Sequence, residues 1–388
     1  MLQIKTISLP ALLLFNGLLL CSCIKEYDPQ IKSSDQSNYV VMGHITDDGG
    51  MQTVNVSLSS PSENPEYIPM DGCNVTVSDN HGNRFLFEST GKGNYTGNIQ
   101  PAFFEQGTLF MVRVITPAGD TILSDYDRYY QVPAVDSVYY TREDIESNTI
   151  GVFTKGIRFY VNLDAKGYTA RNFMWEAVET YEYHVAYPIE WYYDGQVHHI
   201  WPPDSSKLVC WMTKQIPYIF TLSTKNLTEN EYNRFPLQFV DNRTNRLLIG
   251  YSLLVRQYSL SDSAYRYWDE MRINSVEQGG LFTKQPLSVK GNLHIAGKPG
   301  ERVLGAFTVS SVQSKRIFVQ NVENLPIEIE STCNPAPLRR GLREISPYDY
   351  PAYLLGDQFG YSLVVLNENC VNCMIAGGIN VKPDFWPW

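Results

Sequence analysis

Hydrophobic and polar residues alternate along most of this chain with the two-residue period of β-strands. From Tyr39 onwards the alternating runs are short, and clusters of Asp, Asn, Gly and Pro separate them at intervals of about 8 to 20 residues. The first runs are Val54–Leu58, Val75–Val77, Phe85–Phe87 and Met111–Val114. Short strands with frequent turn signals are typical of sandwiches, so the pattern predicts a β-sandwich domain over residues 39–135.

One of these turn signals contains several oxygen atoms that could bind a cation. Residues 79–83 read Asp-Asn-His-Gly-Asn, but they lack the ligand spacing and the terminal Glu of a calcium loop. Asn and Gly readily adopt the positive φ of a tight turn. We therefore predict a hairpin turn here and no metal site.

A larger β-rich domain with a cysteine-containing C-terminal segment is predicted over residues 136–388. Strand-like runs recur there, and a loop-rich aromatic segment extends to about residue 203. The predicted strands cover residues 157–163, 173–182, 216–222, 247–258, 303–312 and 317–319.

A single helix interrupts this β pattern near residues 262–277. Its apolar positions recur at helical spacing and are Ala264, Tyr267, Trp268 and Met271. Ser261 or Ser263 can cap its first turn, and the Gly279-Gly280 pair ends it. The apolar stripe is expected to face the core.

The beginning of the chain is predicted to be a lipoprotein signal peptide, residues 1–22. Lys5 precedes an apolar stretch from Ile7 to Leu20, which as a helix is about 21 Å long and too short for the ~30 Å hydrocarbon layer. Leu20-Cys21-Ser22-Cys23 resembles a bacterial lipobox, which makes Cys23 the acylated N-terminus; an ordinary signal peptide is the alternative. Residues 23–38 then form the acylated N-terminus and a polar tether. Residues 24–28, Ile-Lys-Glu-Tyr-Asp, resemble the acidic signal that sends Bacteroidota lipoproteins to the outside of the outer membrane.

Charge and aromatic content narrow the classes of partner. Asp and Glu number 41 against 31 Lys and Arg, so the chain lacks the basic surface that nucleic-acid binding requires. With 26 Tyr, the aromatic residues favour strands and aromatic contact surfaces.

The remaining cysteines are predicted to form structural disulfides. A lipoprotein lies in an oxidising compartment, where cysteines usually pair. Candidates in the second domain are Cys210, Cys333, Cys370 and Cys373, which allow three pairings, while Cys73 stands apart and is expected to be a free buried thiol. Cys370-Val371-Asn372-Cys373 could also be a redox or zinc motif, but no second such pair accompanies it.

The strongest candidate contact surface is a run rich in Tyr, Trp and His between residues 181 and 201. The candidate contact residues for a ligand or a partner are Tyr183, His184, Trp191, Tyr192 and Trp201. The other interpretation is a hairpin whose aromatic residues merely cover the sandwich. His198 and His199 would point to opposite faces of a strand and could hardly bind one metal ion together, although His184 with one of them and Glu190 could. The motifs of common hydrolases, nucleotide-binding loops and metalloproteases are absent from the sequence, so no catalytic residues and no cofactor are predicted.

Several blocks of the sequence resemble a Bacteroidota outer-membrane lipoprotein family known as domain of unknown function 4249 (DUF4249). The resemblance is carried by residues 251–261 with Ala264-Tyr265, Trp268 and 280–282, and further by residues 40–47, 136–140, 291–293, 303–307 and 377–386. It implies a lipoprotein with an N-terminal sandwich similar to transthyretin or carboxypeptidase-regulatory domains. Family members are often encoded beside TonB-dependent outer-membrane receptors, and the family provides no catalytic residues to carry over.

Together these observations lead us to expect a non-catalytic lipoprotein, anchored by its lipid in the outer membrane and facing outwards. Its expected role is an accessory binding subunit of a TonB-dependent nutrient transporter, with the receptor barrel as partner. One alternative is a structural or adhesive envelope protein that binds a glycan or another membrane protein. A glycan-acting enzyme is the third hypothesis.

Overall fold

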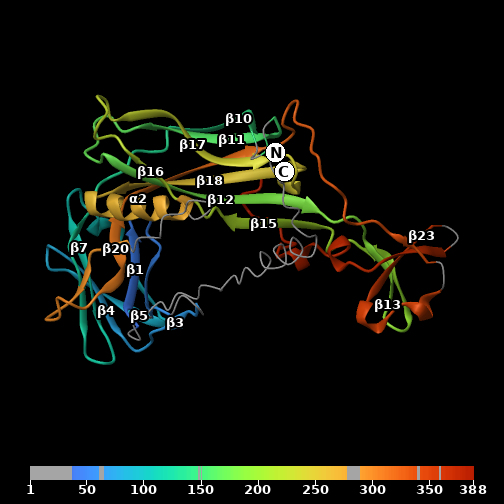
Figure 1. Ribbon diagram of the computed structural model, residues 1–388, viewed down its shortest axis with the longest axis horizontal. Helices are drawn as coiled ribbons and strands as arrows, with labels where there is room; N and C mark the ends of the chain where they lie inside the picture. Colours follow the sequence, from blue (N-terminus) through green and yellow to red (C-terminus); the bar gives the residue numbers. More distant parts are fainter. Residues whose placement is uncertain are drawn as a thin grey trace, which may run out of the picture. The chain divides into compact units, whose positions relative to one another are not determined.

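The computed structural model describes residues 37–60, 65–146, 149, 151–277, 289–338, 341–357 and 360–388. Within these ranges the chain is mostly β, with a single α-helix, α2 (Asp262–Glu277) (Figure 1). The expected fold class is confirmed at this level, as a mostly β chain with one inserted helix. The predicted signal peptide, Cys23, residues 24–36 of the tether and the Gly279-Gly280 pair lie outside the described residues.

Eleven strands of the described chain form one sheet with the order β19-β8-β7-β4-β5-β6-β2-β1-β20, to which β3 and β9 are added at β2 and β7. Side chains from along this order, including Val54, Val77, Phe110 and Phe307, share one buried core. The sandwich arrangement expected for residues 39–135 stays a prediction. The strands are β1 (Tyr39–Thr46), β2 (Met51–Leu58), β3 (Ile68–Pro69), β4 (Asn74–Asp79), β5 (Arg84–Gly91), β6 (Asn94–Asn98), β7 (Leu109–Ile115), β8 (Thr121–Ser124), β9 (Asp127–Arg128), β19 (Leu293–Ile295) and β20 (Val303–Ser310).

Two strands of this sheet come from the segment that the sequence assigned to the second domain. β20 pairs in parallel with β1, from Tyr39 opposite Val303 to Thr46 opposite Ser310, and β19 pairs with β8. The division at residue 135/136 therefore needs correction, because residues 293–310 return to the N-terminal sheet. Parallel pairing between distant strands leaves no local turn signal by which the sequence could reveal it.

The turn at residues 79–83 is a hairpin between β4 and β5, as predicted. Asp79 is buried, and its Oδ1 accepts hydrogen bonds from the backbone N–H groups of His81 (2.9 Å) and Asn83 (2.8 Å). The carboxylate thus organises the turn itself.

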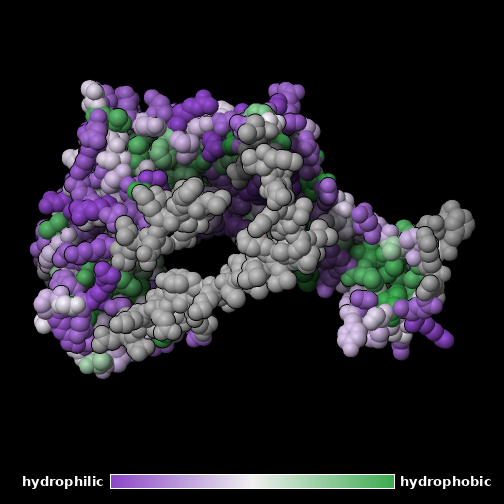
Figure 2. Space-filling model, viewed as in Figure 1, coloured by the Kyte–Doolittle hydropathy of each residue, from purple (hydrophilic) through white to green (hydrophobic). Residues whose placement is uncertain are grey.

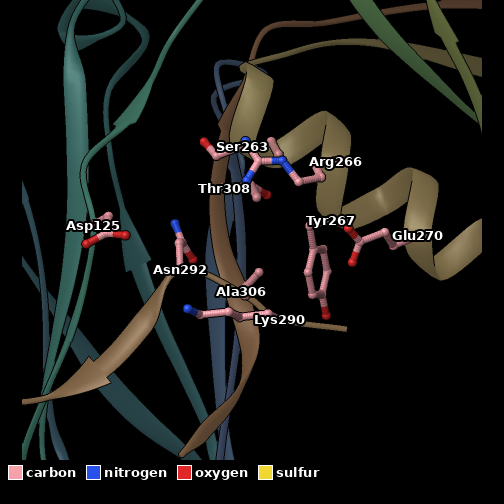
Figure 3. A pocket seen from close by; sticks show the side chains of 11 residues that line it. Asp125, Ser263, Arg266, Tyr267, Glu270, Lys290, Asn292, Ala306 and Thr308 are labelled. Carbon is pink, nitrogen blue, oxygen red and sulfur yellow. The ribbon is translucent and has the colours of Figure 1, made fainter. Parts of the chain in front are cut away.

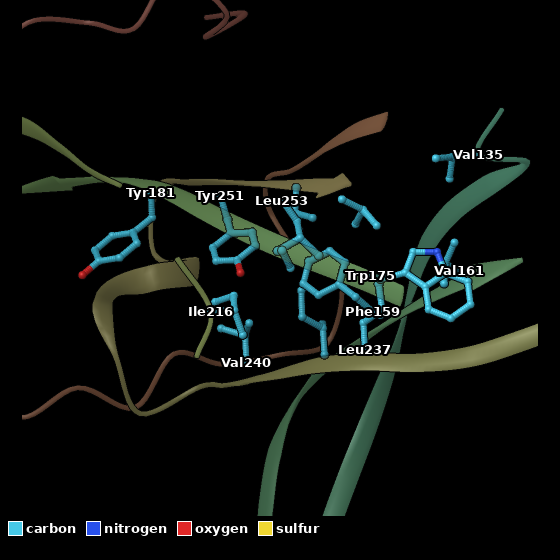
Figure 4. Packing of buried hydrophobic residues seen from close by; sticks show 14 of the residues in the cluster. Val135, Phe159, Val161, Trp175, Tyr181, Ile216, Leu237, Val240, Tyr251 and Leu253 are labelled. Carbon is cyan, nitrogen blue, oxygen red and sulfur yellow. The ribbon is translucent and has the colours of Figure 1, made fainter. Parts of the chain in front are cut away.

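A second core lies among the strands of two further sheets. Rings from different sheets stack within it: Phe159 lies 5.5 Å from Tyr251, and Trp175 lies 4.6 Å from Phe235 (Figure 4). One sheet has the order β10-β11-β17 and the other β15-β12-β18-β21, with β16 also paired to β12. The strands are β10 (Ser137–Glu146), β11 (Phe153–Asp164), β12 (Asn172–His184), β15 (Val209–Gln215), β16 (Phe220–Ser223), β17 (Glu231–Asp241), β18 (Gly250–Leu260) and β21 (Val312–Val319).

Polar side chains inside this second core form one hydrogen-bonded cluster. Glu179 Oε2 accepts from the hydroxyl of Tyr251 (3.0 Å), from Nε2 of Gln238 (3.0 Å) and from a guanidinium nitrogen of Arg246 (3.5 Å). Arg246 also pairs with Asp241 at 3.0 Å. Burial raises the pKa of Tyr251 well above its ordinary value, so its hydroxyl stays protonated and donates.

A small fourth sheet is built from the aromatic run and the C-terminal segment. Its strand order is β14-β13-β23-β24-β22. The strands are β13 (Ile189–Tyr193), β14 (Val197–Asp204), β22 (Ala336–Pro337), β23 (Ala352–Asp357) and β24 (Gly360–Val365). Short 3-10 helices occur at η1 (Pro101–Phe103), η2 (Asn245–Leu247), η3 (Leu342–Glu344), η4 (Pro347–Asp349), η5 (Glu368–Cys370) and η6 (Cys373–Ala376).

Helix α2 has the predicted position and orientation. Ser261 caps it, since its Oγ accepts from the backbone N–H of Ala264 at 3.1 Å. Ala264 belongs to a small core with Met174 and Tyr258, against which Trp268 also packs. Among the described residues, no helix combines the length and the apolar character needed to cross a membrane.

Candidate functional site

The aromatic run forms a β-hairpin, β13–β14, where the sequence led us to expect a loop-rich segment. The structure corrects that expectation. Its turn follows Tyr193, which pairs with Val197, and contains Gly195 with a φ of 110°. β13 also pairs with β23, about 160 residues later in the chain, from Trp191 opposite Leu354. The Asp194-Gly195 turn joins β13 to β14 locally, whereas the pairing with β23 joins segments far apart in the sequence, which no local pattern reveals.

The hairpin stacks its aromatic and imidazole rings in cross-strand pairs. Trp191 lies on His199 with ring centroids 3.7 Å apart, and Tyr192 lies on His198 at 4.4 Å. These pairs lie on opposite faces, because successive residues of a strand alternate. The prediction that His198 and His199 point apart is therefore confirmed.

One face extends the first pair into a row that we call the aromatic ladder: Trp201, His199, Trp191 and Tyr361. His199 lies 6.2 Å from Trp201, and Trp191 lies 5.7 Å from Tyr361 of β24. Trp201 is 74% exposed and His199 is also exposed, whereas Trp191 is half-buried. The ladder thus presents flat rings to solvent from a strand framework. Sequence reasoning missed His199 and Tyr361, although the two-residue spacing of His199 and Trp201 was a signal for the first.

Carboxylates hold both imidazoles of the hairpin in place. His198 Nε2 lies 2.9 Å from Asp194 Oδ1, and His199 Nε2 lies 3.6 Å from Glu190 Oε1. The hydrogen bond from His198 lowers the pKa of Asp194. Each ring therefore has a stacking partner and a carboxylate partner, which restricts its orientation.

Two of the candidate contact residues lie away from the ladder. Tyr183 is only 6% exposed, and its hydroxyl donates to the backbone carbonyl of Cys373, so its assignment as a contact residue is wrong. Burial raises the pKa of this hydroxyl. His184 is exposed but pairs with Glu182 at 2.8 Å, and the other Glu182 oxygen accepts from Trp386 Nε1 at 3.1 Å.

The histidines of the hairpin are not grouped with His184 as metal ligands would be. In the part of the chain that the structure describes, no three His, Cys, Asp or Glu side chains are grouped in that way. Of the predicted contact residues, Trp191 and Trp201 lie on the face of the aromatic ladder, and Tyr192 lies on the opposite face of the hairpin.

The cysteines of the second domain form two disulfides. Cys370 and Cys373 of the Cys-Val-Asn-Cys motif belong to different disulfides. Cys210 bonds to Cys373, which ties the C-terminal segment to β15. Cys333 bonds to Cys370 beside the small fourth sheet, where both pack against Tyr353 and Val365. These bonds select one of the three pairings that the sequence left open.

Among the described cysteines Cys73 has no disulfide partner, as expected, but it is half-buried and not fully buried. Its backbone N–H donates to the hydroxyl of Tyr95 at 2.9 Å, and burial raises the pKa of its thiol. A protonated thiol is a poor nucleophile, so Cys73 is a packing residue.

The small fourth sheet also carries partly exposed apolar side chains. Figure 2 shows hydrophobic residues over the region labelled β13 and β23 in Figure 1. Leu338, Leu342 and Ile345 are only partly buried there, packed on Ala352 and Leu354.

Comparison with known proteins agrees with the resemblance noted in the sequence. No curated protein matches the chain. Residues 24–316 match the family described as "Domain of unknown function (DUF4249)", and the match ends before the C-terminal strands of the fourth sheet. Because it covers well over half of the chain, the protein belongs to the DUF4249 family.

Proposed function

We propose that this protein is a lipid-anchored binding protein of the outer membrane that serves as an accessory subunit of a TonB-dependent transporter. In this proposal Cys23 carries the lipid, and the aromatic ladder contacts the receptor barrel. The proposal favours binding over catalysis, because the ladder consists of flat rings and one restrained imidazole, which can stack against a partner.

The observation that carries the proposal is the exposure of Trp201 at the end of the aromatic ladder. A tryptophan that is 74% exposed has much of its apolar surface in water. Trp and Tyr residues of this kind dominate the binding energy of protein interfaces. Partly buried Leu338, Leu342 and Ile345 extend apolar surface over the same sheet.

Two features give the ladder the rigidity that a binding surface needs. The ring of His199 stacks on Trp191 and lies beside the carboxylate of Glu190. The His199 side chain therefore has little rotamer freedom to lose on binding. The Cys333–Cys370 disulfide links the two ends of the segment that contains β22, β23 and β24 of the fourth sheet.

The location rests on the lipobox-like residues 20–23 and on membership of the family. Several acyl chains on Cys23 would hold the protein firmly, since each buried CH₂ contributes about 0.8 kcal/mol. The acidic residues after Cys23 favour the external face of the membrane.

The test is a pull-down from the native outer membrane. The tagged, natively lipidated protein is extracted in mild detergent, and the co-purifying proteins are identified and quantified by mass spectrometry. We expect a TonB-dependent barrel in near-equal amount with the wild type. Recovery of the lipoprotein alone would overturn the accessory role.

Substitutions then test the ladder. Trp201→Ala removes an exposed ring and should reduce barrel recovery about 30-fold, the equivalent of about 2 kcal/mol. Tyr348→Ala is the matched control, because Tyr348 is a fully exposed aromatic residue in η4, outside the ladder. Equal recovery with both variants would show that the barrel binds another surface.

The same stacking faces also suit sugar rings, which favours glycan binding as the second candidate. It predicts that the purified wild type binds envelope glycans in a titration while no barrel is recovered. Trp201→Ala should abolish that binding, and Tyr348→Ala should retain it.

A further inference from the structure

A cavity of about 410 Å³ lies beside strand β12, between helix α2 and the loop that joins β15 to β16. Its volume is within the range of small-molecule sites. All of its lining residues except Glu176 and Gln215 are apolar or aromatic, which is the usual composition of a ligand site. The cavity shares no residue with the aromatic ladder, so a site here goes beyond the proposed function and does not depend on it.

An irregularity in the strand pairing creates this cavity. β15 and β16 both pair with β12, but the four loop residues between them, 216–219, stand opposite only Glu176 and Ala177 of β12. The N–H of Ile216 donates to the carbonyl of Ala177 at 2.8 Å, and Pro217, which has no N–H, cannot continue the ladder. The loop therefore leaves the sheet and forms one wall of the cavity. Irregular strand pairing of this kind is over-represented next to active sites.

Helix α2 supplies another wall of the cavity with Trp268. The hydroxyl of Thr221 in β16 donates to Oδ1 of Asp269 at 2.8 Å, which fixes the helix beside the loop. A different side of α2, with Arg266 and Glu270, lines a separate cavity that lies against β20 and contains charges of both signs (Figure 3). The cavity beside Trp268 is thus distinct from that one in both place and charge.

Glu176 is the single charged residue among the described residues that line this cavity. It is half-buried, and its Oε2 accepts from the hydroxyl of Tyr258 at 2.8 Å. Its cross-strand neighbour Arg256 pairs with Asp48 at 2.9 Å, and no cation of the described chain lies within 4 Å of the Glu176 carboxylate. The other oxygen, Oε1, has no hydrogen-bond partner in the described ranges and is not among the enclosed polar atoms, so a ligand can reach it.

We propose that this cavity binds a small organic cation, an ammonium group joined to an apolar body. The ammonium pairs with Oε1 of Glu176, and the aromatic side chains of Tyr218 and Trp268 add the attraction of their rings for a cation. The apolar body of the ligand contacts Met174 and Ile219. One carboxylate in an otherwise uncharged cavity complements a single positive charge and disfavours an anion.

The experiment measures binding of defined probes to the full chain in a non-ionic detergent. The probes are choline and phenethylamine, and each has an uncharged control of matched shape, dimethylbutanol for choline and phenylethanol for phenethylamine. The shift in melting temperature selects a probe, and calorimetric titration gives its Kd. We expect at least one of the two cations to bind with a Kd below about 1 mM and its uncharged control to bind at least about 10-fold more weakly.

Variants separate this site from nonspecific binding. Glu176→Gln keeps the size of the side chain and an acceptor for Tyr258 but removes the charge, so it should weaken the selected cation at least about 10-fold. Tyr218→Ala removes a ring that is 60% exposed, so it should leave the melting temperature unchanged and weaken the cation about 5-fold. Glu323→Gln and Tyr126→Ala are the matched controls, because both residues are exposed and lie outside the cavity, and they should bind the cation as the wild type does.

Three results would overturn the proposal. The first is that neither cation binds with a Kd below about 1 mM. The second is an uncharged control that binds as tightly as its cation, since it would identify a merely apolar site. The third is unchanged affinity for the cation in Glu176→Gln. If Glu176→Gln does not fold, Tyr218→Ala decides in its place, and unchanged affinity in that variant overturns the proposal.

Discussion

Asp127 connects helix α2 to the N-terminal sheet, and its replacement tests how that connection is made. The carboxylate is 1% exposed. Its Oδ1 accepts from the hydroxyls of Ser261 and Ser263 at the start of α2, and its Oδ2 accepts from the backbone N–H of Val309 in β20 at 2.8 Å. One side chain therefore satisfies donors of two elements, the start of α2 and strand β20.

The two substitutions Asp127→Asn and Asp127→Ala should differ strongly. Asn keeps an oxygen for Val309, and its amide can donate to Ser261 and Ser263, whose hydroxyls can turn to accept. Ala leaves the buried N–H of Val309 without an acceptor and weakens the cap. We expect a loss in unfolding free energy of about 3 kcal/mol for Ala and about 1 kcal/mol or less for Asn.

The pH dependence follows from burial, which raises the pKa of Asp127. The native state then holds the proton more tightly than the unfolded chain, whose Asp pKa is about 3.9. The stability that this protonation contributes is complete below that value and is lost as the pH rises through the native pKa. Asn does not titrate, so the stability difference should move in favour of Asp127→Asn as the pH is raised from about 4 to 8.

The assay is urea unfolding followed by tryptophan fluorescence at several pH values. Asp125→Ala is the control, because Asp125 is a largely exposed Asp two residues away, and it should stay within about 0.5 kcal/mol of wild type. The reasoning is refuted if Asn costs as much as Ala, or if Ala costs less than about 1 kcal/mol.

Three more predictions concern other parts of the fold, each measured by urea unfolding without reductant. Replacing both Cys210 and Cys373 by Ser should cost about 5 kcal/mol, because this bond closes a separation of 163 residues; a loss below about 2 kcal/mol contradicts that entropy argument. Gly291→Ala should cost about 3 kcal/mol by forcing a Cβ onto a carbonyl of β20, whereas Gly300→Ala, in open space, should be neutral, and equal effects would refute the steric argument. Glu179→Leu should cost about 3 kcal/mol because buried donors lose their acceptor, and a neutral result would show that they find other partners.

The local features of this protein were readable from its sequence. Helix α2 follows from four apolar residues at helical spacing and from Ser261 as its cap. The turn at Asp79 follows from residues that favour positive φ and from a carboxylate able to accept nearby N–H groups. The opposite directions of His198 and His199 follow from strand alternation alone. Each of these depends on interactions within a few residues.

The predicted contact residues do not share one surface. Trp191 and Trp201 lie on the face of the aromatic ladder and Tyr192 on the opposite face of the hairpin, while Tyr183 lies in the core beside the Cys210–Cys373 disulfide. An aromatic strand residue has the same local pattern whether its face meets another sheet or water, so its burial could not be inferred.

The sequence by itself determined that the chain is mostly β, that one helix interrupts the strands and that its cysteines could pair. Only the tertiary structure decided that β20 lies beside β1, that β13 pairs with β23 and which cysteines bond. The physical reason is the range of the interactions. Alternation, helical spacing and caps arise between neighbours in the chain, whereas strand partners and cavities depend on which distant surfaces exclude water together.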